Sequence, residues 1–300
     1  MRRPTTSSCD SKGSPRIPPP HLRAGRKPVN PRSSPRFSGK VALVTGSSRG
    51  LGQALGKALA REGASVVFNS SRTPFDGALV ASAANQEAGQ AIYVKADVAS
   101  ESDIAQIAEL IEERFGRIDV IIHNAADGLE CCASEVSWDD FERTFRTNTF
   151  ALIALARSMA PLMNEGKLLY VSSFGADRAV PGYGVVGASK AASEALVRSL
   201  AMELAPRIQV NTLRPAIIPT LSLRAFSLAD EFLEMASHES PMGLGTIDDI
   251  VESALFLCSP EAGFITGQVL TVDGGMGTSV FRSSWAPAAI EADPAMTNHD

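Results

Sequence analysis

The sequence predicts an α/β protein in which a doubly wound parallel sheet is covered by helices on both faces. Short apolar segments typical of buried strands alternate with amphipathic segments of helical length from Lys40 to about residue 275. A glycine-rich turn also connects the first of these strands to the first helix. A single domain spanning residues 38–275 accounts for both observations.

Seven segments are expected to form the strands, because each is a short, largely apolar run bounded by glycine or polar residues. In chain order they are VALVTG at 41–46, ASVVFNSS at 64–71, AIYVKAD at 91–97, RIDVIIHNAA at 117–126, GKLLYVSS at 166–173, IQVNTLRP at 208–215 and QVLTVDGG at 268–275. Helical periodicity between nearly every pair suits the crossover connections that parallel strands need.

Composition places the chain among ordinary globular proteins, with 44% apolar and 20% charged residues in a length of 300. No apolar run approaches the roughly 18 residues of a membrane span, and the N-terminus lacks the apolar core of a secretory signal. We therefore expect a cytoplasmic protein without a membrane span. The cysteines at 9, 131, 132 and 258 have no metal-site spacing, so no metal centre is expected.

Residues 1–37 are predicted to be a disordered tail, because they are rich in proline, serine and arginine and offer almost nothing apolar to bury. A transit peptide, a basic tether to an anionic partner and an inconsequential extension all remain open. The prolines oppose the amphipathic helix of a transit peptide, which favours the last of these. Residues 276–300 lack periodicity and are expected to form a second loose tail, or a cover for a neighbouring subunit.

The tail and the rest of the chain have opposite charge. Nine Lys and Arg and one acid give residues 1–37 a charge of +8, so a total of −5 leaves −13 for the remainder. That remainder argues against a nucleic-acid partner.

The turn TGSSRGLG at 45–52 predicts a phosphate-binding site. Its glycines allow a tight turn and a close approach of the backbone to a pyrophosphate, while the following helix N-terminus favours negative charge. We assign the cofactor phosphates to Gly46, Ser48, Arg49, Gly50, Leu51 and Gly52.

The end of the second strand indicates which dinucleotide is bound. A carboxylate there would accept hydrogen bonds from the adenosine ribose and favour NADH, but FNSSR at 68–72 contains no acid. Arg49 and Arg72 can instead pair with a 2′-phosphate. NADPH is therefore the predicted cofactor.

These motifs together resemble the short-chain dehydrogenase/reductase family, whose members have a single Rossmann-type domain. TGSSRGLG is similar to its TGxxxGxG turn and HNAA at 123–126 to its NNAG stretch. The likeness continues through Asp97 in KADV, Asn148, VSS at 171–173, Tyr183 with Lys190, RPAIIPT at 214–220 and VDGG at 272–275. It covers nearly all of residues 38–275 in the family's order. It implies cofactor contacts from Asp97, Val98, Asn124, Ala125, Lys190, Ile218 and Thr220.

One spacing departs from most of that family. The usual tyrosine stands four positions before the lysine, where this chain has Val186, whereas Tyr183 in GYGVVGASK stands seven positions before Lys190. This spacing resembles the enoyl-acyl-carrier-protein reductases, and most closely their NADPH-dependent type III branch. On one continuous helix, seven residues make about two turns and rise about 10.5 Å, against about 6 Å for four. The hydroxyl would therefore reach deeper into the cleft.

By resemblance, the reaction is NADPH-dependent reduction of the C2–C3 double bond of a trans-2-enoyl thioester in fatty-acid or related acyl biosynthesis. The carrier is an acyl carrier protein or coenzyme A. Tyr183 would hydrogen-bond the enolate oxygen, Lys190 would hold the nicotinamide ribose and Asn148 would brace the site. Ser173 or Ser172 would take the family's serine place. An NADP-dependent 3-ketoacyl or carbonyl reductase, an alcohol dehydrogenase and a non-catalytic NADP-binding protein are the alternatives.

Three further expectations concern the surroundings of the site. His123, in place of the first asparagine of NNAG, is expected to be buried and satisfied. The helically spaced apolar residues of 226–235 are expected to form a mobile lid over an acyl chain. The helix over 190–204 has small or apolar residues on more than one face, which indicates a homodimer or homotetramer.

Overall fold

We describe the protein from a computed structural model at residues 35–72, 78, 80–82, 84–85 and 90–278. Most of both predicted tails, residues 1–34 and 279–300, therefore lies outside the described residues. Within the described part, no helix has the length and apolar character needed to cross a bilayer.

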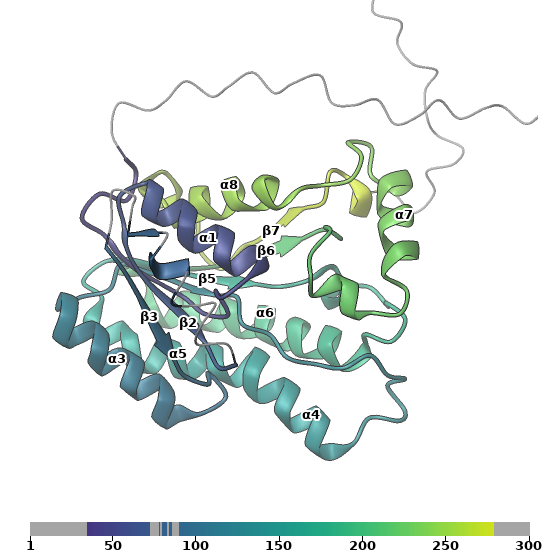
Figure 1. Ribbon diagram of the computed structural model, residues 1–300, viewed down its shortest axis with the longest axis horizontal. Helices are drawn as coiled ribbons and strands as arrows, with labels where there is room; N and C mark the ends of the chain where they lie inside the picture. Colours follow the sequence, from purple (N-terminus) through teal and green to yellow (C-terminus); the bar gives the residue numbers. More distant parts are fainter. Residues whose placement is uncertain (1–34, 73–77, 79, 83, 86–89, 279–300) are drawn as a thin grey trace, which may run out of the picture. The chain divides into compact units, whose positions relative to one another are not determined.

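Seven parallel strands form one sheet in the order β3-β2-β1-β4-β5-β6-β7, which confirms the predicted fold class (Figure 1). The strand order changes direction between β1 and β4, and ligands of open α/β sheets bind at such a point. The strands are β1 (Val41–Val44), β2 (Ser65–Ser70), β3 (Ala91–Lys95), β4 (Val120–His123), β5 (Gly166–Val171), β6 (Ile208–Pro215) and β7 (Val269–Val272).

Helices cover both faces of the sheet (Figure 1). One face carries α1 (Gly50–Arg61) and α8 (Ile247–Cys258), and the other carries α3 (Glu101–Phe115), α5 (Ala151–Met159) and α6 (Gly184–Leu204). The helix α4 (Trp138–Phe145) enters α5 through a π-helical turn, η1 (Arg146–Phe150), and α7 (Ala229–Glu239) follows β6. The 3-10 turns are η2 (Ala160–Leu162), η3 (Phe174–Ala176), η4 (Leu223–Ala225), η5 (Pro260–Ala262) and η6 (Met276–Thr278).

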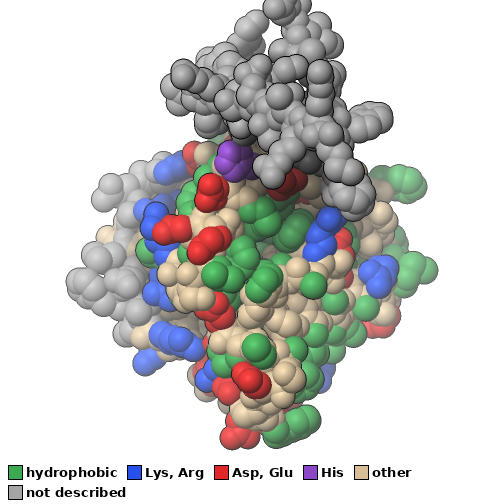
Figure 2. Space-filling view, turned by 90° about the vertical axis from the view of Figure 1, so that its right-hand side faces the viewer, with side chains coloured by type: hydrophobic (Ala, Val, Ile, Leu, Met, Phe, Trp, Pro, Cys, Tyr) green, Lys and Arg blue, Asp and Glu red, His purple; other side chains and the backbone are tan. Residues whose placement is uncertain are grey.

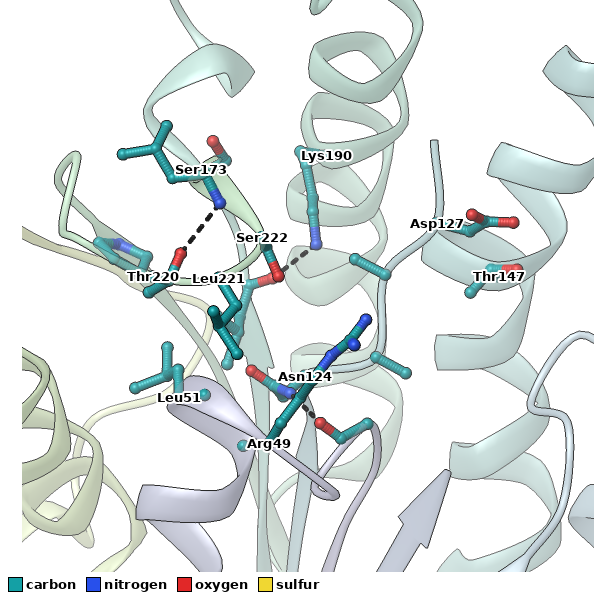
Figure 3. A pocket seen from close by; sticks show the side chains of 18 of the residues that line it. Arg49, Leu51, Asn124, Asp127, Thr147, Ser173, Lys190, Thr220, Leu221 and Ser222 are labelled. Carbon is teal, nitrogen blue, oxygen red and sulfur yellow. Dashed lines mark hydrogen bonds between the residues drawn. The ribbon is translucent and has the colours of Figure 1, made fainter. Parts of the chain in front are cut away.

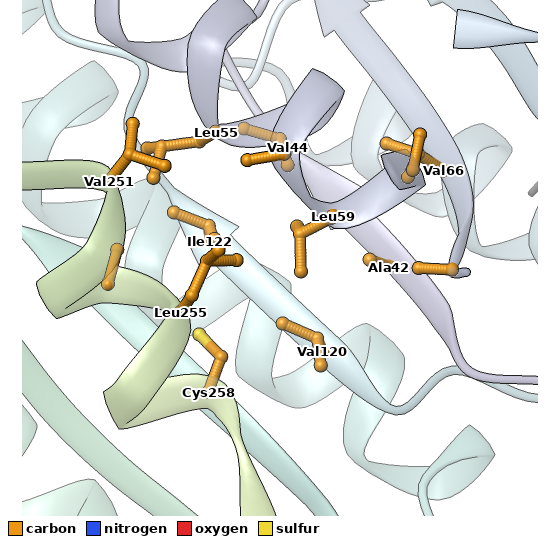
Figure 4. Close-up of a cluster of buried hydrophobic side chains, with 14 of the residues drawn as sticks. Ala42, Val44, Leu55, Leu59, Val66, Val120, Ile122, Val251, Leu255 and Cys258 are labelled. Carbon is orange, nitrogen blue, oxygen red and sulfur yellow. The ribbon is translucent and has the colours of Figure 1, made fainter. Parts of the chain in front are cut away.

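The core has one apolar layer on each side of the sheet. Figure 4 shows the layer beneath α1 and α8, where Leu55 and Leu59 face Val251 and Leu255 across the end of Ile122. All four residues of β1 are buried because both of its faces are covered. Strands of this kind are continuous apolar runs without alternation, which is why they were recognisable in the sequence.

Local signals fix several helix boundaries. The hydroxyl of Ser100 accepts from the backbone N–H of Asp103 and starts α3, and Gly116 at φ +67° ends it. Thr246 and Asp249 form a reciprocal capping box at the start of α8. Such caps satisfy backbone groups that have no partner within the helix.

The domain begins earlier than the sequence indicated. Phe37 is 1% exposed and belongs to the core layer under α1, and the Arg36 guanidinium lies 2.8 Å from Glu62. At the other end, Met276 is buried and the Gly277 carbonyl accepts from Arg178 at 2.7 Å. The predicted tail, residues 1–37, therefore extends too far into the domain. A single aromatic residue beside a polar run has no periodicity that would reveal its burial.

Truncation separates the tail from the domain. Deleting residues 1–34 should leave the melting temperature nearly unchanged, whereas Phe37→Ala should lower the free energy of unfolding by about 3–5 kcal/mol through loss of core packing. Phe264→Ala, the same change at a fully exposed phenylalanine (105%), should cost less than about 0.5 kcal/mol. Equal losses at the two positions in urea titrations would contradict the placement of Phe37.

Candidate active site

A cleft of about 710 Å³ opens along the carboxyl ends of β1, β2, β4, β5 and β6. Nearly every residue predicted from the sequence to bind the cofactor or react lines it: Gly46, Ser48, Arg49, Gly50, Leu51, Gly52, Arg72, Asp97, Val98, Asn124, Ala125, Ser173, Tyr183, Lys190, Ile218 and Thr220. Figure 3 shows Arg49, Asn124, Lys190 and Thr220 converging on it from separate elements. The exception is Asn148, which is fully buried behind the cleft.

The glycine turn after β1 is packed too closely for side chains. A Cβ on Gly46, at φ +62°, would lie 2.7 Å from the Ala125 Cα, and one on Gly52 would lie 2.4 Å from the Gly46 carbonyl oxygen. No side chain caps the start of α1, where Arg49 is the N-cap residue. A bare helix N-terminus behind a glycine turn is suited to a pyrophosphate, so these residues fit a dinucleotide.

The hydroxyl of Thr45 joins this turn to the end of β4. It accepts from the backbone N–H groups of Asn124 (3.1 Å) and Ala125 (3.0 Å), which leaves its proton for Nδ1 of His123 at 3.0 Å. His123 is therefore neutral with its proton on Nε2, and burial lowers its pKa to about 3.

The expectation that His123 is satisfied holds for one ring nitrogen only. The carbonyls of Thr147 and Asn148 act on the ring, but neither makes a hydrogen bond of ordinary geometry with the buried Nε2. These carbonyls belong to the π-helical turn, where the regular helical pattern is interrupted.

Lys190 extends from α6 into the cleft and is 4% exposed (Figure 3). Its ammonium donates to the Val171 carbonyl at 2.9 Å and lies 4.9 Å from the centre of the Tyr170 ring. Burial lowers the pKa of Lys190 to about 8, and the negative charge of Glu194 opposes that shift. The cleft therefore holds a cation with only one hydrogen-bond partner on the described protein.

Asn148 binds the residue that precedes this lysine on α6. Its amide donates to the hydroxyl of Ser189 and to the carbonyl of Asp127, both at 2.9 Å, and its oxygen accepts from the backbone N–H of Asp127 at 2.8 Å. Ser189 directly precedes Lys190 on α6. Asn148 therefore fixes α6 relative to the segment that follows β4.

Tyr183 is the N-cap residue of α6, with φ −110° and ψ 8°, and not a helical residue. Its carbonyl accepts the first hydrogen bond of α6, from the backbone N–H of Gly187 at 2.8 Å, so the tyrosine directly adjoins the helix that carries Lys190. Tyr183 also lines the same cleft as Lys190. Burial raises the pKa of its hydroxyl, and a hydrogen bond with Ser173 acts in the opposite direction.

The two serines after β5 have different partners. Ser172 donates its hydroxyl proton to the buried carboxylate of Glu194 at 2.6 Å, whereas Ser173 is the serine beside Tyr183. Val186, at the place of the family's usual tyrosine, is 5% exposed and packs against Gly128, where a Cβ would lie 2.2 Å from its Cγ2. A larger side chain at 186 has no room.

The adenosine end of the cleft has arginines and no acid on β2. Asn69, the penultimate residue of that strand, donates its side-chain amide to the Ala96 carbonyl at 3.0 Å. Arg72 is 74% exposed and lies 3.4 Å from Asp127, which also pairs with Arg143 at 2.9 Å. Sequence reasoning missed Asp127 and Arg143, because no local motif indicates that α4 reaches this cleft.

The substrate end of the cleft is apolar and lies under η4 and α7. Phe174, Val180, Phe226 and Phe232 line it, and the Phe226 ring lies 5.6 Å from the Tyr183 ring. The outer side of this cover is partly apolar as well: Leu221, Met235 and Met242 are 40–63% exposed. Figure 2, which faces the α7 side, shows hydrophobic and acidic side chains mixed on this surface.

A dinucleotide cradle beside a tyrosine, a serine and a buried lysine defines a nicotinamide-dependent oxidoreductase, and comparison with known proteins agrees. Residues 46–277 match a family model described as enoyl-(acyl carrier protein) reductase. The chain belongs to the short-chain dehydrogenase/reductase family, in its branch that resembles enoyl-acyl-carrier-protein reductases.

Its relatives differ in what they act on. The chain is 32% identical to the 7alpha-hydroxysteroid dehydrogenase of Escherichia coli strain K12, over 80% of this chain and 95% of that protein. It is also 32% identical to the NADH-dependent enoyl-[acyl-carrier-protein] reductase FabI of Aquifex aeolicus, over 80% and 92%. The 1-cyclohexenylcarbonyl-CoA reductase of Streptomyces collinus is 32% identical over 79% and 86%.

Solved structures share the fold at similar identity. A short-chain dehydrogenase from Burkholderia cenocepacia J2315 in complex with NADP has a TM-score of 0.74 and 30% identity, covering 80% of this chain and 99% of that chain. The chain is thus an NAD(P)-dependent oxidoreductase.

Proposed function

We propose that the protein reduces the C2–C3 double bond of a trans-2-enoyl thioester with NADPH. The observation that carries this proposal is the place of Tyr183 before the first turn of α6, with the apolar Val186 packed where a carbonyl-reducing tyrosine would stand. Conjugate reduction delivers hydride to C3, two carbons from the carbonyl, so the group that binds the oxygen must lie farther from the lysine. The apolar end of the cleft suits an acyl chain.

Each residue of the site would have a separate role in the reaction. Bound NADPH would supply the hydride that adds at C3, and a proton from solvent would add at C2 to complete the reduction. Tyr183, which is protonated at neutral pH and whose pKa burial raises further, would donate a hydrogen bond to the thioester oxygen as negative charge develops. Lys190 would hold the nicotinamide ribose hydroxyls, Asn148 would keep α6 in place, and Ser173 would orient the tyrosine hydroxyl.

Removing the tyrosine hydroxyl tests this assignment. Tyr183→Phe should lower kcat on crotonyl thioester by about two to three orders of magnitude with the Kd of NADPH unchanged, because the lost hydrogen bond forms mainly in the transition state. Absorbance of the reduced nicotinamide follows turnover. Tyr93→Phe, which removes a hydroxyl bonded to Ser70 at the edge of the sheet, is the matched control and should change kcat little. Full activity in Tyr183→Phe would show that the tyrosine only packs.

A carbonyl reductase or alcohol dehydrogenase is the second candidate, favoured by the Ser173–Tyr183 hydrogen bond and by the hydroxysteroid dehydrogenase relative. Acetoacetyl thioester in a parallel assay distinguishes the two. Faster turnover of the keto substrate than of the enoyl substrate would replace the first proposal with the second. If the protein turned over neither substrate, the remaining alternative would be a non-catalytic NADP-binding protein.

NADPH is the proposed cofactor because β2 ends without an acid and Arg49 and Arg72 line the cleft there. NADPH should bind more tightly than NADH, and Arg72→Ala should narrow the difference by about 1–3 kcal/mol, as expected for a charge-assisted contact. Arg114→Ala, at an exposed arginine of α3 outside the cleft, is the control. Equal Kd values for both cofactors in the unaltered protein, measured by fluorescence titration, would refute the assignment.

We also propose that the chain forms a homodimer or homotetramer in the cytoplasm, with the outer faces of α4 and α6 in contact between copies. On α6, Ala195, Ser199 and Met202 are exposed, Met202 to 81%. On α4, Trp138 is 71% exposed. Sedimentation at micromolar concentration should give at least a dimer, and Met202→Glu should weaken it. A monomer under these conditions would contradict the proposal.

A further inference from the structure

The carboxylate of Glu130 joins two segments that are far apart in the sequence. Glu130 lies in the segment that follows β4. Ser227 lies between η4 and α7, within residues 221–239, which form the cover of the cleft. Oε2 accepts from the backbone N–H of Ser227 at 2.8 Å, and Oε1 accepts from its hydroxyl at 2.5 Å. One side chain therefore binds both donors of one residue in the cover.

The stem of Glu130 is fixed on its other side by the segment that carries Tyr183. Gly182 has φ +70°, and a Cβ there would lie 2.7 Å from Cγ of Glu130. The backbone N–H of Cys131 also donates to the Gly182 carbonyl at 3.1 Å, and Cys131 pairs with Tyr183 in an isolated β-bridge. Residues 130 and 131 are thus docked on the turn immediately before α6.

The two segments that Glu130 joins meet again inside the cleft. Phe226 directly precedes Ser227, and its ring lies 5.6 Å from that of Tyr183. Both rings line the cleft, whereas Glu130 does not. A displacement of Ser227 from Glu130 would therefore shift Phe226 beside Tyr183, even when no residue that lines the cleft has been substituted.

The rest of the cover is loosely attached. Leu221 is 63% exposed and Met235 is 40% exposed, so much of its apolar surface is not buried against the domain. Its far end is anchored separately, because Ser240 and Met242 both donate to the Gly274 carbonyl, at 3.1 and 3.3 Å. Regions with few buried contacts open at low free-energy cost, so individual hydrogen bonds decide their position.

We propose that Glu130 is a positioning residue that holds residues 221–239 against Tyr183 and so determines how closely the site covers an acyl chain. This inference deepens the proposed function and rests on it for the identity of the substrate. The carboxylate suits the role because it is an acceptor only and meets two donors. The hydrogen bonds from Ser227 hold the pKa of Glu130 below its usual value, so it is ionised at neutral pH.

Hydrogen exchange of the full chain tests the position of the cover without reference to any substrate. Glu130→Ala should speed amide exchange in residues 221–232 by about tenfold, while exchange in α6 stays unchanged. Ser227→Ala, which removes the hydroxyl and keeps the N–H, should give a smaller increase. Glu135→Ala, at an exposed acid of the same segment, is the control and should change neither region.

Steady-state kinetics then test the link to catalysis. Glu130→Ala should raise KM for crotonyl thioester several-fold with the Kd of NADPH unchanged, and Glu130→Gln, which keeps the volume and one acceptor, should lie between it and the unaltered protein. Unchanged exchange in Glu130→Ala would overturn the proposal whatever the kinetics show. Faster exchange in a protein that reduces no enoyl thioester would sustain the role of Glu130 and overturn the proposed function alone.

Discussion

Hydrogen bonds between parallel strands determine the direction in which every loop of the site leaves the sheet. The register pairs Val44 with Ile122, His123 with Tyr170 and Val171 with Leu213, so the carboxyl ends of β1, β4, β5 and β6 lie side by side. The residues directly after β1, β4 and β5 are polar, and Thr45 and Asn124 bind backbone groups of the neighbouring loop. Thr45 is the clearest example, since one hydroxyl holds two N–H groups of the segment after β4.

A second set of contacts fixes α6 to the end of β5. Three consecutive residues of the strand end each have a partner on or before the helix: Val171 with Lys190, Ser172 with Glu194, and Ser173 with Tyr183. Glu194 is itself held by Arg214 of β6, with Nε at 3.0 Å and Nη2 at 2.5 Å. Removing one partner of such a buried pair leaves an uncompensated charge, so the arrangement resists small displacements of the helix.

Features encoded in short stretches of sequence could be predicted. The central strands β1, β4 and β5 are fully buried and largely apolar because both faces of the sheet are covered there, and the glycines of 46–52 share one turn. The cleft gathers the predicted cofactor residues because parallel topology brings strand ends together.

Features that depend on contacts distant in sequence could not. Phe37 is buried by elements that follow it, and Asp127 pairs with two residues of other elements, Arg72 after β2 and Arg143 on α4. The N-cap position of Tyr183 adjoins a turn that contacts a distant segment, since the Gly182 carbonyl accepts from the N–H of Cys131. Nothing near Glu130 in the chain indicates Ser227 as its partner.

The burial of Lys190 makes the stability of the fold depend on pH in a direction opposite to that of most surface lysines. Its folded pKa of about 8 lies below the value of 10.5 for a free lysine, so the unfolded chain binds the extra proton between these two pH values. This residue therefore disfavours folding fully below pH 8, by on the order of 3 kcal/mol, and the penalty disappears as the pH rises toward 10.5. A neutral side chain of similar volume would fold better but would lack the charge that the proposed function assigns to the ribose hydroxyls. The fold thus carries at this position a residue that opposes its own stability, which agrees with the ligand contact proposed for it.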